Sequence, residues 1–287
     1  MTELHVPSYA KVNLFLDVGE KRPEDGYHYI RTVMMPISLQ DDIVLREAHE
    51  ITVRFTPDLP GPPETNLAYR AAHLLKDATG YPGGAAIEVR KRIPVAGGLA
   101  GGSTNGAAVL TGLNRLWGTG LTDAQLISLA IGLGSDVPFF VPGRPARVEG
   151  IGEVVTPIRT KHPLWLVLAT PEVAKSTGNV FRLYDELPAG EHPDLTAMEA
   201  ALGEGDLPGV AASLANVFER VMLPLHPEIA GLKEGMLRAG ALGALMSGAG
   251  PTVFGLVEGE EAGHRLLKAI RPLAPRACLV HSVGSEA

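Results

Sequence analysis

A glycine-rich segment near the middle of the chain constrains its folding more than any other feature. A short alternating apolar run precedes it and a helical pattern follows it, so the segment is expected to join a strand to a helix. Four glycines within six residues let the backbone adopt positive φ and approach a bulky anion closely, while the start of the helix favours negative charge. The residues predicted to hold this anion are Pro94, Val95, Ala96, Gly97, Gly98, Leu99, Ala100, Gly101, Gly102, Ser103 and Thr104.

The amino-acid sequence excludes two common nucleotide-binding motifs. Gly97 and Gly102 have the Walker A spacing, but Ser103-Thr104 follows where that motif requires Lys and then Ser or Thr. No G-x-G-x-x-G dinucleotide fingerprint occurs in the chain. The structural alternative is a tight strand-to-helix turn. The two hydroxyl residues at the helix start favour the anion site, because they could bond phosphate oxygens or a metal ion.

The remaining pattern predicts an α+β protein of two halves, residues 1–160 and residues 161–287. Alternating apolar residues predict strands at about residues 10–18, 30–39, 43–46, 51–55 and 85–91. Helices are expected from Asn66 to Gly80, from a Ser103 cap to Gly118, and from the Thr122–Gln125 capping box to Gly132. In the second half we expect strands at 164–169, 252–257 and 277–283 and helices at 207–222, 227–239 and 260–270.

Composition excludes several function classes. The 287 residues carry a net charge of −7, which argues against nucleic acid as a main partner. The single cysteine, Cys278, excludes an intramolecular disulfide and a cysteine-based zinc cluster. The N-terminal residues lack a signal peptide pattern, and no apolar run approaches the roughly 20 residues that span a bilayer. We therefore expect a cytoplasmic protein with no membrane partner.

Three further motifs are weak when each is taken alone. Lys11 and Asn13 share one face of the first predicted strand, where a lysine points either into a site or into solvent at an edge. Asp136 precedes an apolar run, a position typical of a turn or helix cap. The small-residue stretch from Met246 to Phe254 enters a predicted strand, as a β-bulge or hairpin turn also would.

Taken together and in this order, the four motifs resemble those of the GHMP kinases, which include galactokinase, homoserine kinase and mevalonate kinase. The resemblance covers nearly the full length. Two small departures are Ser8-Tyr9 between Pro7 and Ala10, and Ala100 where relatives often carry Gly or Ser. Neither removes a donor or a charge. The resemblance implies an N-terminal half like domain 2 of ribosomal protein S5, which carries the ATP loop, and a ferredoxin-like α/β C-terminal half.

Within this family, Gly26-Tyr27-His28 is similar to the branch whose substrate carries a cytidine diphosphate group. That likeness implies phosphorylation of the 2-hydroxyl of a cytidyl derivative of methylerythritol, in non-mevalonate isoprenoid synthesis. It implies that Tyr27 and Phe181 sandwich the cytosine, that His28 reads its polar edge, and that Thr177 also contacts the substrate. Stacking on an aromatic face suits any base, so a polar neighbour must supply the selectivity. The structural alternative for Tyr27 and His28 is closure of a hairpin loop.

The resemblance also assigns the catalytic roles. Asp136 would accept the proton of the substrate hydroxyl, Lys11 would stabilise charge on the attacking oxygen, and Asn13 would hold the substrate hydroxyls. ATP with Mg²⁺ is the expected cofactor, although no clear carboxylate pair stands out as a metal ligand. A monomer or weak homodimer is expected. The alternatives are a kinase of the homoserine or mevalonate type, and a non-catalytic nucleotide-binding relative.

Overall fold

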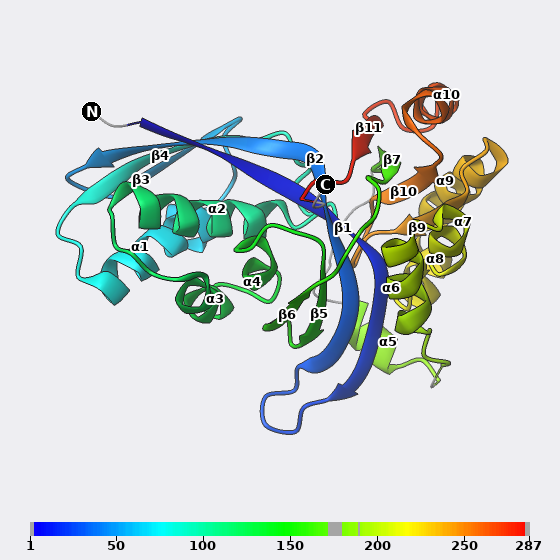
Figure 1. Ribbon diagram of the computed structural model, residues 1–287, viewed down its shortest axis with the longest axis horizontal. Helices are drawn as coiled ribbons and strands as arrows, with labels where there is room; N and C mark the ends of the chain where they lie inside the picture. Colours follow the sequence, from blue (N-terminus) through cyan, green and yellow to red (C-terminus); the bar gives the residue numbers. More distant parts are fainter. Residues whose placement is uncertain (1–2, 172–179, 189, 285–287) are drawn as a thin grey trace. The chain divides into compact units, whose positions relative to one another are not determined.

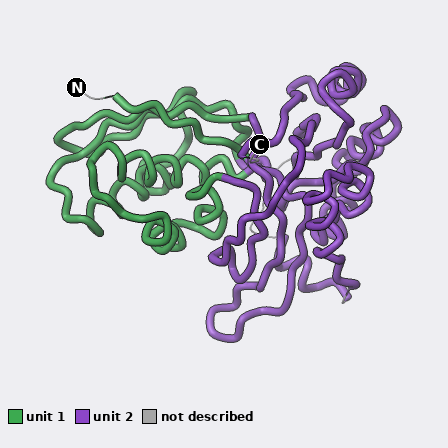
Figure 2. Tube along the Cα trace, in the orientation of Figure 1, with its two compact units in different colours: residues 1–10, 39–95, 100–143 green, residues 11–38, 96–99, 144–287 purple. Residues whose placement is uncertain are grey.

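The computed structural model describes residues 3–171, 180–188 and 190–284. The chain forms two compact units that interleave along the sequence (Figure 2). The first unit comprises residues 1–10, 39–95 and 100–143, and the second comprises residues 11–38, 96–99 and 144–287. Two long strands, β1 (Glu3–Lys21) and β2 (His28–Ala48), contribute to both units (Figure 1). The division of the chain into an N-terminal and a C-terminal half at residue 160 remains a prediction.

The first unit contains β4 (Gly84–Arg90), the strand before the glycine-rich segment, and α2 (Gly101–Leu116), the helix after it. Its other elements are β3 (Thr52–Thr56), the 3-10 turn η1 (Pro63–Thr65), α1 (Leu67–Thr79), α3 (Asp123–Ile131) and α4 (Val137–Phe140). β4 pairs antiparallel with β2 and parallel with β3. Alternate residues of these strands, such as Ile43, Leu45 and Ile87, are buried in one core with apolar residues of α1, α2 and α3.

Helix boundaries in this unit follow the local sequence signals. The Asn66 side chain accepts a hydrogen bond from Ala68 N at the start of α1, and Gly80 ends that helix with φ 66°. Thr122 and Gln125 form both hydrogen bonds of the predicted capping box of α3. The cap predicted at Ser103 is wrong, because α2 already begins at Gly101, with Ala100 as its N-cap residue.

The second unit is built on a four-stranded sheet in the order β11-β7-β10-β9. β10 lies between two antiparallel neighbours and is buried along its whole length. Apolar residues of α8, α9 and α10 share a core with this sheet. The elements of this unit are β5 (Ala146–Gly150), β6 (Val154–Pro157), β7 (Trp165–Ala169), α5 (Val180–Asp185), α6 (Leu195–Glu204), α7 (Leu207–Ala212), β8 (Ala215–Asn216), α8 (Glu219–Leu225), α9 (Pro227–Arg238), β9 (Gly243–Met246), β10 (Val253–Val257), α10 (Glu260–Ile270) and β11 (Cys278–His281).

The helix predicted over residues 207–222 is also wrong. Two short helices, α7 and α8, occupy this region, and the two-residue strand β8 separates them. β8 pairs in parallel with β1, with Leu16 opposite Asn216. Pairing with a distant strand therefore interrupts a segment whose local pattern favours one helix. Among the described helices, none combines the length and the apolar character needed to cross a bilayer.

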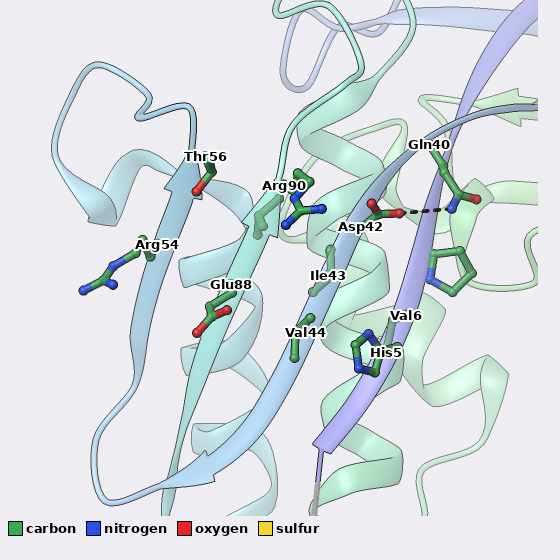
Figure 3. A pocket seen from close by; sticks show the side chains of 12 residues that line it. His5, Val6, Gln40, Asp42, Ile43, Val44, Arg54, Thr56, Glu88 and Arg90 are labelled. Atoms are coloured by element: carbon green, nitrogen blue, oxygen red, sulfur yellow. Dashed lines mark hydrogen bonds between the residues drawn. The ribbon is translucent and has the colours of Figure 1, made fainter.

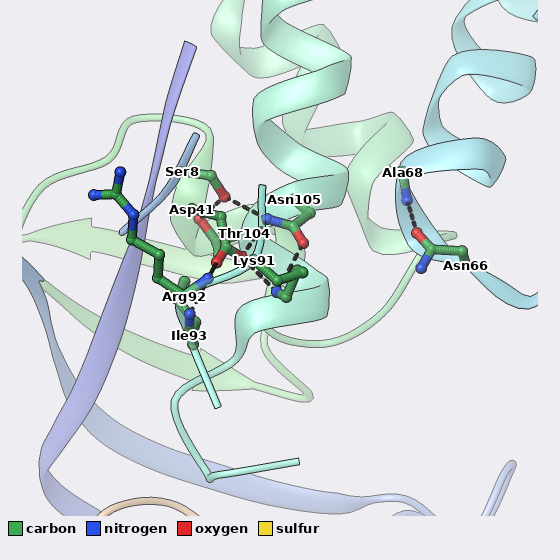
Figure 4. Close-up of polar contacts among 9 residues, drawn as sticks. All are labelled: Ser8, Asp41, Asn66, Ala68, Lys91, Arg92, Ile93, Thr104 and Asn105. Atoms are coloured by element: carbon green, nitrogen blue, oxygen red, sulfur yellow. Dashed lines mark hydrogen bonds and ion pairs between the residues drawn. The ribbon is translucent and has the colours of Figure 1, made fainter. Parts of the chain in front are cut away.

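A buried polar network in the first unit fixes both flanks of the glycine-rich segment (Figure 4). Asp41 of β2 is fully buried and pairs with the Lys91 ammonium. Its Oδ1 accepts hydrogen bonds from the backbone N–H groups of Arg92 at 2.6 Å and Ile93 at 2.9 Å. Its Oδ2 accepts a hydrogen bond from the Asn105 side chain on α2 at 2.9 Å. One carboxylate thus holds the chain just before the segment and the helix just after it.

We predict that Asp41→Ala destabilises the protein by about 3–5 kcal/mol, because it leaves the buried Lys91 ammonium without its carboxylate. Asp42→Ala is the matched control on the same strand. Asp42 pairs with an exposed Arg92 guanidinium, and its loss should cost no more than about 1 kcal/mol. Urea unfolding of both variants measures the difference. Equal losses in the two variants would contradict a structural role for the Asp41 carboxylate.

Candidate active site

Two polar side chains of β1, Lys11 and Asn13, lie buried in the second unit. Lys11 is 3% exposed and Asn13 is 1% exposed. The Lys11 ammonium donates a hydrogen bond to Asn13 Oδ1, and Asn13 Nδ2 donates one to Thr32 Oγ1 on β2 at 2.8 Å. Burying an ammonium is costly unless hydrogen bonds compensate it. Its burial excludes the interpretation of Lys11 as a solvent-facing edge residue.

The small-residue loop between β9 and β10 packs against this pair and against the first part of the glycine-rich segment. Ser247 Oγ donates a hydrogen bond to Gly98 O at 3.0 Å and accepts one from Asn13 N at 3.3 Å. Thr252 N donates to Gly97 O at 3.2 Å, and Lys11 N donates to Leu99 O at 3.2 Å. Three segments that are distant in sequence therefore share one hydrogen-bonded cluster within the second unit.

Two glycines permit this close approach. Gly98 has φ 77°, and a Cβ there would lie 2.2 Å from the carbonyl oxygen of Ser247. A Cβ on Gly248 would lie 3.3 Å from Asn13 Oδ1 and 3.4 Å from Lys11 Nζ, and this residue also has positive φ. Neither position can take a side chain without displacing the cluster. The motif between Met246 and Phe254 thus has a role beyond turning the chain.

The start of α2 presents backbone donors without a side-chain cap. Ala100, its N-cap residue, has φ 54° and makes no capping hydrogen bond through its side chain. Ser103 is partly exposed on the first turn, whereas Thr104 is buried and its hydroxyl accepts a hydrogen bond from Ser8 Oγ at 3.1 Å. Of the two hydroxyl residues, Ser103 is therefore the more accessible, and Thr104 belongs to the buried network.

Asp136 lies in the first unit, directly before the short helix α4. It occupies the N-cap position, yet its side chain makes no capping hydrogen bond. Val137 N instead bonds to Gly134 O at 3.1 Å. Capping of α4 therefore does not explain this carboxylate. Asp136 and Lys11 belong to different compact units, and their pairing remains a prediction.

The predicted cytosine clamp involves the β1–β2 connection and α5 of the second unit. Tyr27 is 61% exposed, and Phe181 is 39% exposed. The Phe181 ring stacks on His28, with centroids 5.6 Å apart and an interplanar angle of 29°. Phe181 thus lies beside His28, the residue that follows Tyr27 in the chain. Thr177 lies outside the described residues.

Both ring nitrogens of His28 face oxygen atoms of the second unit. Nδ1 lies 2.8 Å from Gly19 O, and Nε2 lies 2.9 Å from Asp185 Oδ1. The second contact has the distance of an ion pair but lacks hydrogen-bond geometry, so Nε2 makes no hydrogen bond despite its burial. The imidazole is held beneath Phe181 by these neighbours, which sets the orientation of the ring.

A separate hollow of about 530 Å³ lies on the strands of the first unit (Figure 3). Charged and polar side chains line it, among them His5, Asp42, Arg54, Glu88 and Arg90. These residues lie on the strand face opposite the buried Ile43 and Leu45. None of the residues predicted to bind substrate or ATP lines this hollow, so it is not part of the candidate site.

Models of one family match two parts of the chain. The GHMP kinases N terminal domain matches residues 66–144, and the GHMP kinases C terminal domain matches residues 198–272. Together these regions span more than half of the chain. The first includes the glycine-rich segment and Asp136, and the second includes the loop with Ser247.

Relatives of known name match almost the entire chain. The 4-diphosphocytidyl-2-C-methyl-D-erythritol kinase of Symbiobacterium thermophilum is 61% identical over 98% of this chain and 100% of its own length. That of Bacillus subtilis is 43% identical over 96% of both chains. A crystal structure of 4-(cytidine 5'-diphospho)-2C-methyl-D-erythritol kinase superimposes with a TM-score of 0.83 at 36% identity, covering 98% of this chain and 100% of that one.

A more distant likeness shows the fold alone. Homoserine kinase from Cytophaga hutchinsonii has a TM-score of 0.77 at 20% identity, over 99% of this chain and 95% of that one. The predicted α+β fold of this family is thereby confirmed. The chain belongs to the GHMP kinases, and its near-full-length relatives place it with the branch named 4-diphosphocytidyl-2-C-methyl-D-erythritol kinase.

Proposed function

We infer that this chain is an ATP-dependent kinase that phosphorylates the 2-hydroxyl of 4-diphosphocytidyl-2-C-methyl-D-erythritol, in non-mevalonate isoprenoid synthesis. The observation that carries this function is the 61% identity to a kinase of that name over its whole length. The burial of Lys11 and Asn13 against the glycine-rich segment agrees with it. ATP use follows from membership of the kinase family.

The reaction transfers one phosphoryl group between two oxygens. The substrate hydroxyl oxygen attacks the γ-phosphorus of ATP, the bond to the β,γ-bridging oxygen breaks, and ADP leaves with that oxygen. We propose that the hydroxyl proton passes to the Asp136 carboxylate. Lys11 would stabilise negative charge on the attacking oxygen, and Asn13 would hold the methylerythritol hydroxyls. Catalysis of this kind depends on positioning and on charge stabilisation.

ATP is proposed to bind along the segment from Pro94 to Thr104. The uncapped N–H groups at the start of α2 suit a phosphate, and Ser103 adds a partly exposed hydroxyl. Within the described residues, no cluster of three or more His, Cys, Asp or Glu side chains forms a metal site. We propose that Mg²⁺ binds together with the ATP phosphates. Bound there, the ion would neutralise phosphate charge.

We also propose a cytoplasmic enzyme that acts as a monomer or weak homodimer, without nucleic acid or membrane partners. The net charge of −7 is the observation against a nucleic-acid partner. A kinase of the homoserine or mevalonate type is the alternative activity, and a shared fold at 20% identity gives it no specific support.

A panel of substrates separates these activities directly. ADP release is measured with the cytidyl diphosphate substrate, homoserine and mevalonate, each with ATP and Mg²⁺. We expect turnover with the cytidyl compound alone. Comparable turnover of homoserine or mevalonate would reject the proposed substrate, and no turnover with any of the three would support a non-catalytic relative.

We predict that Gly102→Val weakens ATP binding at least tenfold, or by about 1.4 kcal/mol, without loss of thermal stability. The residue is exposed on the first turn of α2, and its added Cβ would meet no atom nearer than Leu67 Cδ1 at 3.9 Å. Gly101 is unsuitable, because its Cβ would lie 2.9 Å from Ile93 Cγ2. Calorimetric titration with ATP and a thermal melt provide the two readouts.

Gly231→Val is the matched control for this substitution. Gly231 lies on an exposed helical position of α9, and its added Cβ would meet no atom within 4 Å. It should leave ATP affinity unchanged. Unaltered ATP affinity in Gly102→Val would show that the start of α2 does not contact the nucleotide.

We predict that Tyr27→Ala weakens binding of the cytidyl substrate by about 1–3 kcal/mol, the usual contribution of one stacked base. ATP affinity should stay unchanged. Tyr29→Ala is the matched control, because Tyr29 is a neighbouring tyrosine that is 49% exposed. Steady-state kinetics with each substrate varied in turn distinguish the effects. An equal loss in both variants, or none in Tyr27→Ala, would contradict the clamp.

A further inference from the structure

Asn216 of β8 is buried beside the cluster that contains Lys11, and its side chain bonds the backbone three times. The residue is 7% exposed. Its Nδ2 donates one hydrogen bond to Met246 O at 2.7 Å and another to Gly248 O at 2.8 Å. Its Oδ1 accepts one from Phe218 N at 3.0 Å, at the start of α8. Both N–H groups of the Asn216 amide donate a hydrogen bond, and both of these bonds go to the segment that contains Ser247.

The loop held by Asn216 is the one that contacts the candidate site. Ser247 lies between the two carbonyl groups that Asn216 binds, and its hydroxyl joins Gly98 O to Asn13 N. Glu219 adds a second restraint, since its Oε1 accepts a hydrogen bond from Met246 N at 2.9 Å. Ser247 thus links the loop that Asn216 binds to the Lys11–Asn13 pair through side-chain hydrogen bonds.

The local fold indicates why an asparagine occupies this position. The chain leaves α7, pairs for two residues with β1, and enters α8. The side chain at this break accepts a hydrogen bond from Phe218 N, at the residue before α8, and also reaches the β9–β10 loop. An amide does both, because its oxygen accepts and its nitrogen donates two hydrogen bonds. A carboxylate of the same shape could accept the hydrogen bond from Phe218 N but would face two carbonyl oxygens with no donor.

We propose that Asn216 is a positioning residue for phosphoryl transfer. It fixes the loop from Met246 to Gly250 so that Ser247 aligns Asn13, and with it Lys11, against the carbonyl oxygen of Gly98. This role rests on the proposed function, in which these residues meet the substrate hydroxyl and ATP. Asn216 itself touches neither, so its loss should lower kcat more than it raises KM.

The test compares Asn216→Asp with Asn114→Asp in the full chain. Asn114 is a matched control: its Nδ2 donates to Leu121 O at 3.0 Å and its Oδ1 accepts from Leu121 N at 2.9 Å. Asn114 lies near the C-terminal end of α2 and holds the connection between α2 and α3 in the first unit. Both substitutions replace an amide that bridges backbone groups, so both should lower the thermal midpoint.

Only Asn216→Asp should lower kcat, by about 10–100-fold, since a displacement near 1 Å can cost that much. Hydrogen exchange at residues 10–14 and 246–252 should accelerate in this variant alone, because its lost bonds restrain that loop. If Asn216→Asp does not fold, Asn216→Ala removes the two donors without adding charge and serves in its place. Equal loss of kcat in Asn216→Asp and Asn114→Asp would overturn the proposal, as would unchanged hydrogen exchange at the loop.

A double-mutant cycle with Ser247→Ala tests the path itself. If Asn216 acts through Ser247, the double variant should lose no more kcat than the worse single variant. Multiplicative losses would overturn the proposed path. Wild-type protein that is inactive on the cytidyl substrate would reject the proposed function instead, and the hydrogen-exchange comparison would still decide whether Asn216 holds the loop.

Discussion

The burial of the Lys11 ammonium is the constraint on which the candidate site depends. A lysine that is 3% exposed needs hydrogen-bond acceptors in place of water, and Asn13 supplies one from the same strand. The neighbouring backbone must then approach closely enough to exclude solvent. Gly98 and Gly248 allow this approach, since neither can carry a Cβ without displacing the cluster. The glycine motifs and the buried lysine are therefore parts of one arrangement.

A second buried lysine has a different role. Lys91 pairs with the fully buried Asp41, which also holds the backbone before the glycine-rich segment and Asn105 after it. This ion pair lies within the first unit and fixes both flanks of the segment. Preorganised flanks reduce the ordering that nucleotide binding would otherwise require. The two lysines thus divide between substrate chemistry, as proposed for Lys11, and support of the glycine-rich segment, as observed for Lys91.

Local sequence signals predicted much of the fold, because they act within one turn or strand. Asn66, Gly80 and the Thr122–Gln125 box mark helix ends correctly. Two expectations about helices were wrong. The Ser103 cap failed because positive φ at Ala100 starts α2 earlier, and the helix over 207–222 failed because β1 pairs with β8. Asp41 and Asn216 bind partners that are roughly 30 or more residues away, which no local pattern reveals.

The kinetic effect of Lys11→Met tests the central claim most directly, because methionine keeps much of the length of the side chain and removes its charge. We predict a fall in kcat of about 100-fold or more with little change in KM for ATP, since the ammonium would act on the charge that develops on the attacking oxygen. A change confined to KM for ATP, with kcat intact, would contradict it and make Lys11 a ligand of the ground-state nucleotide.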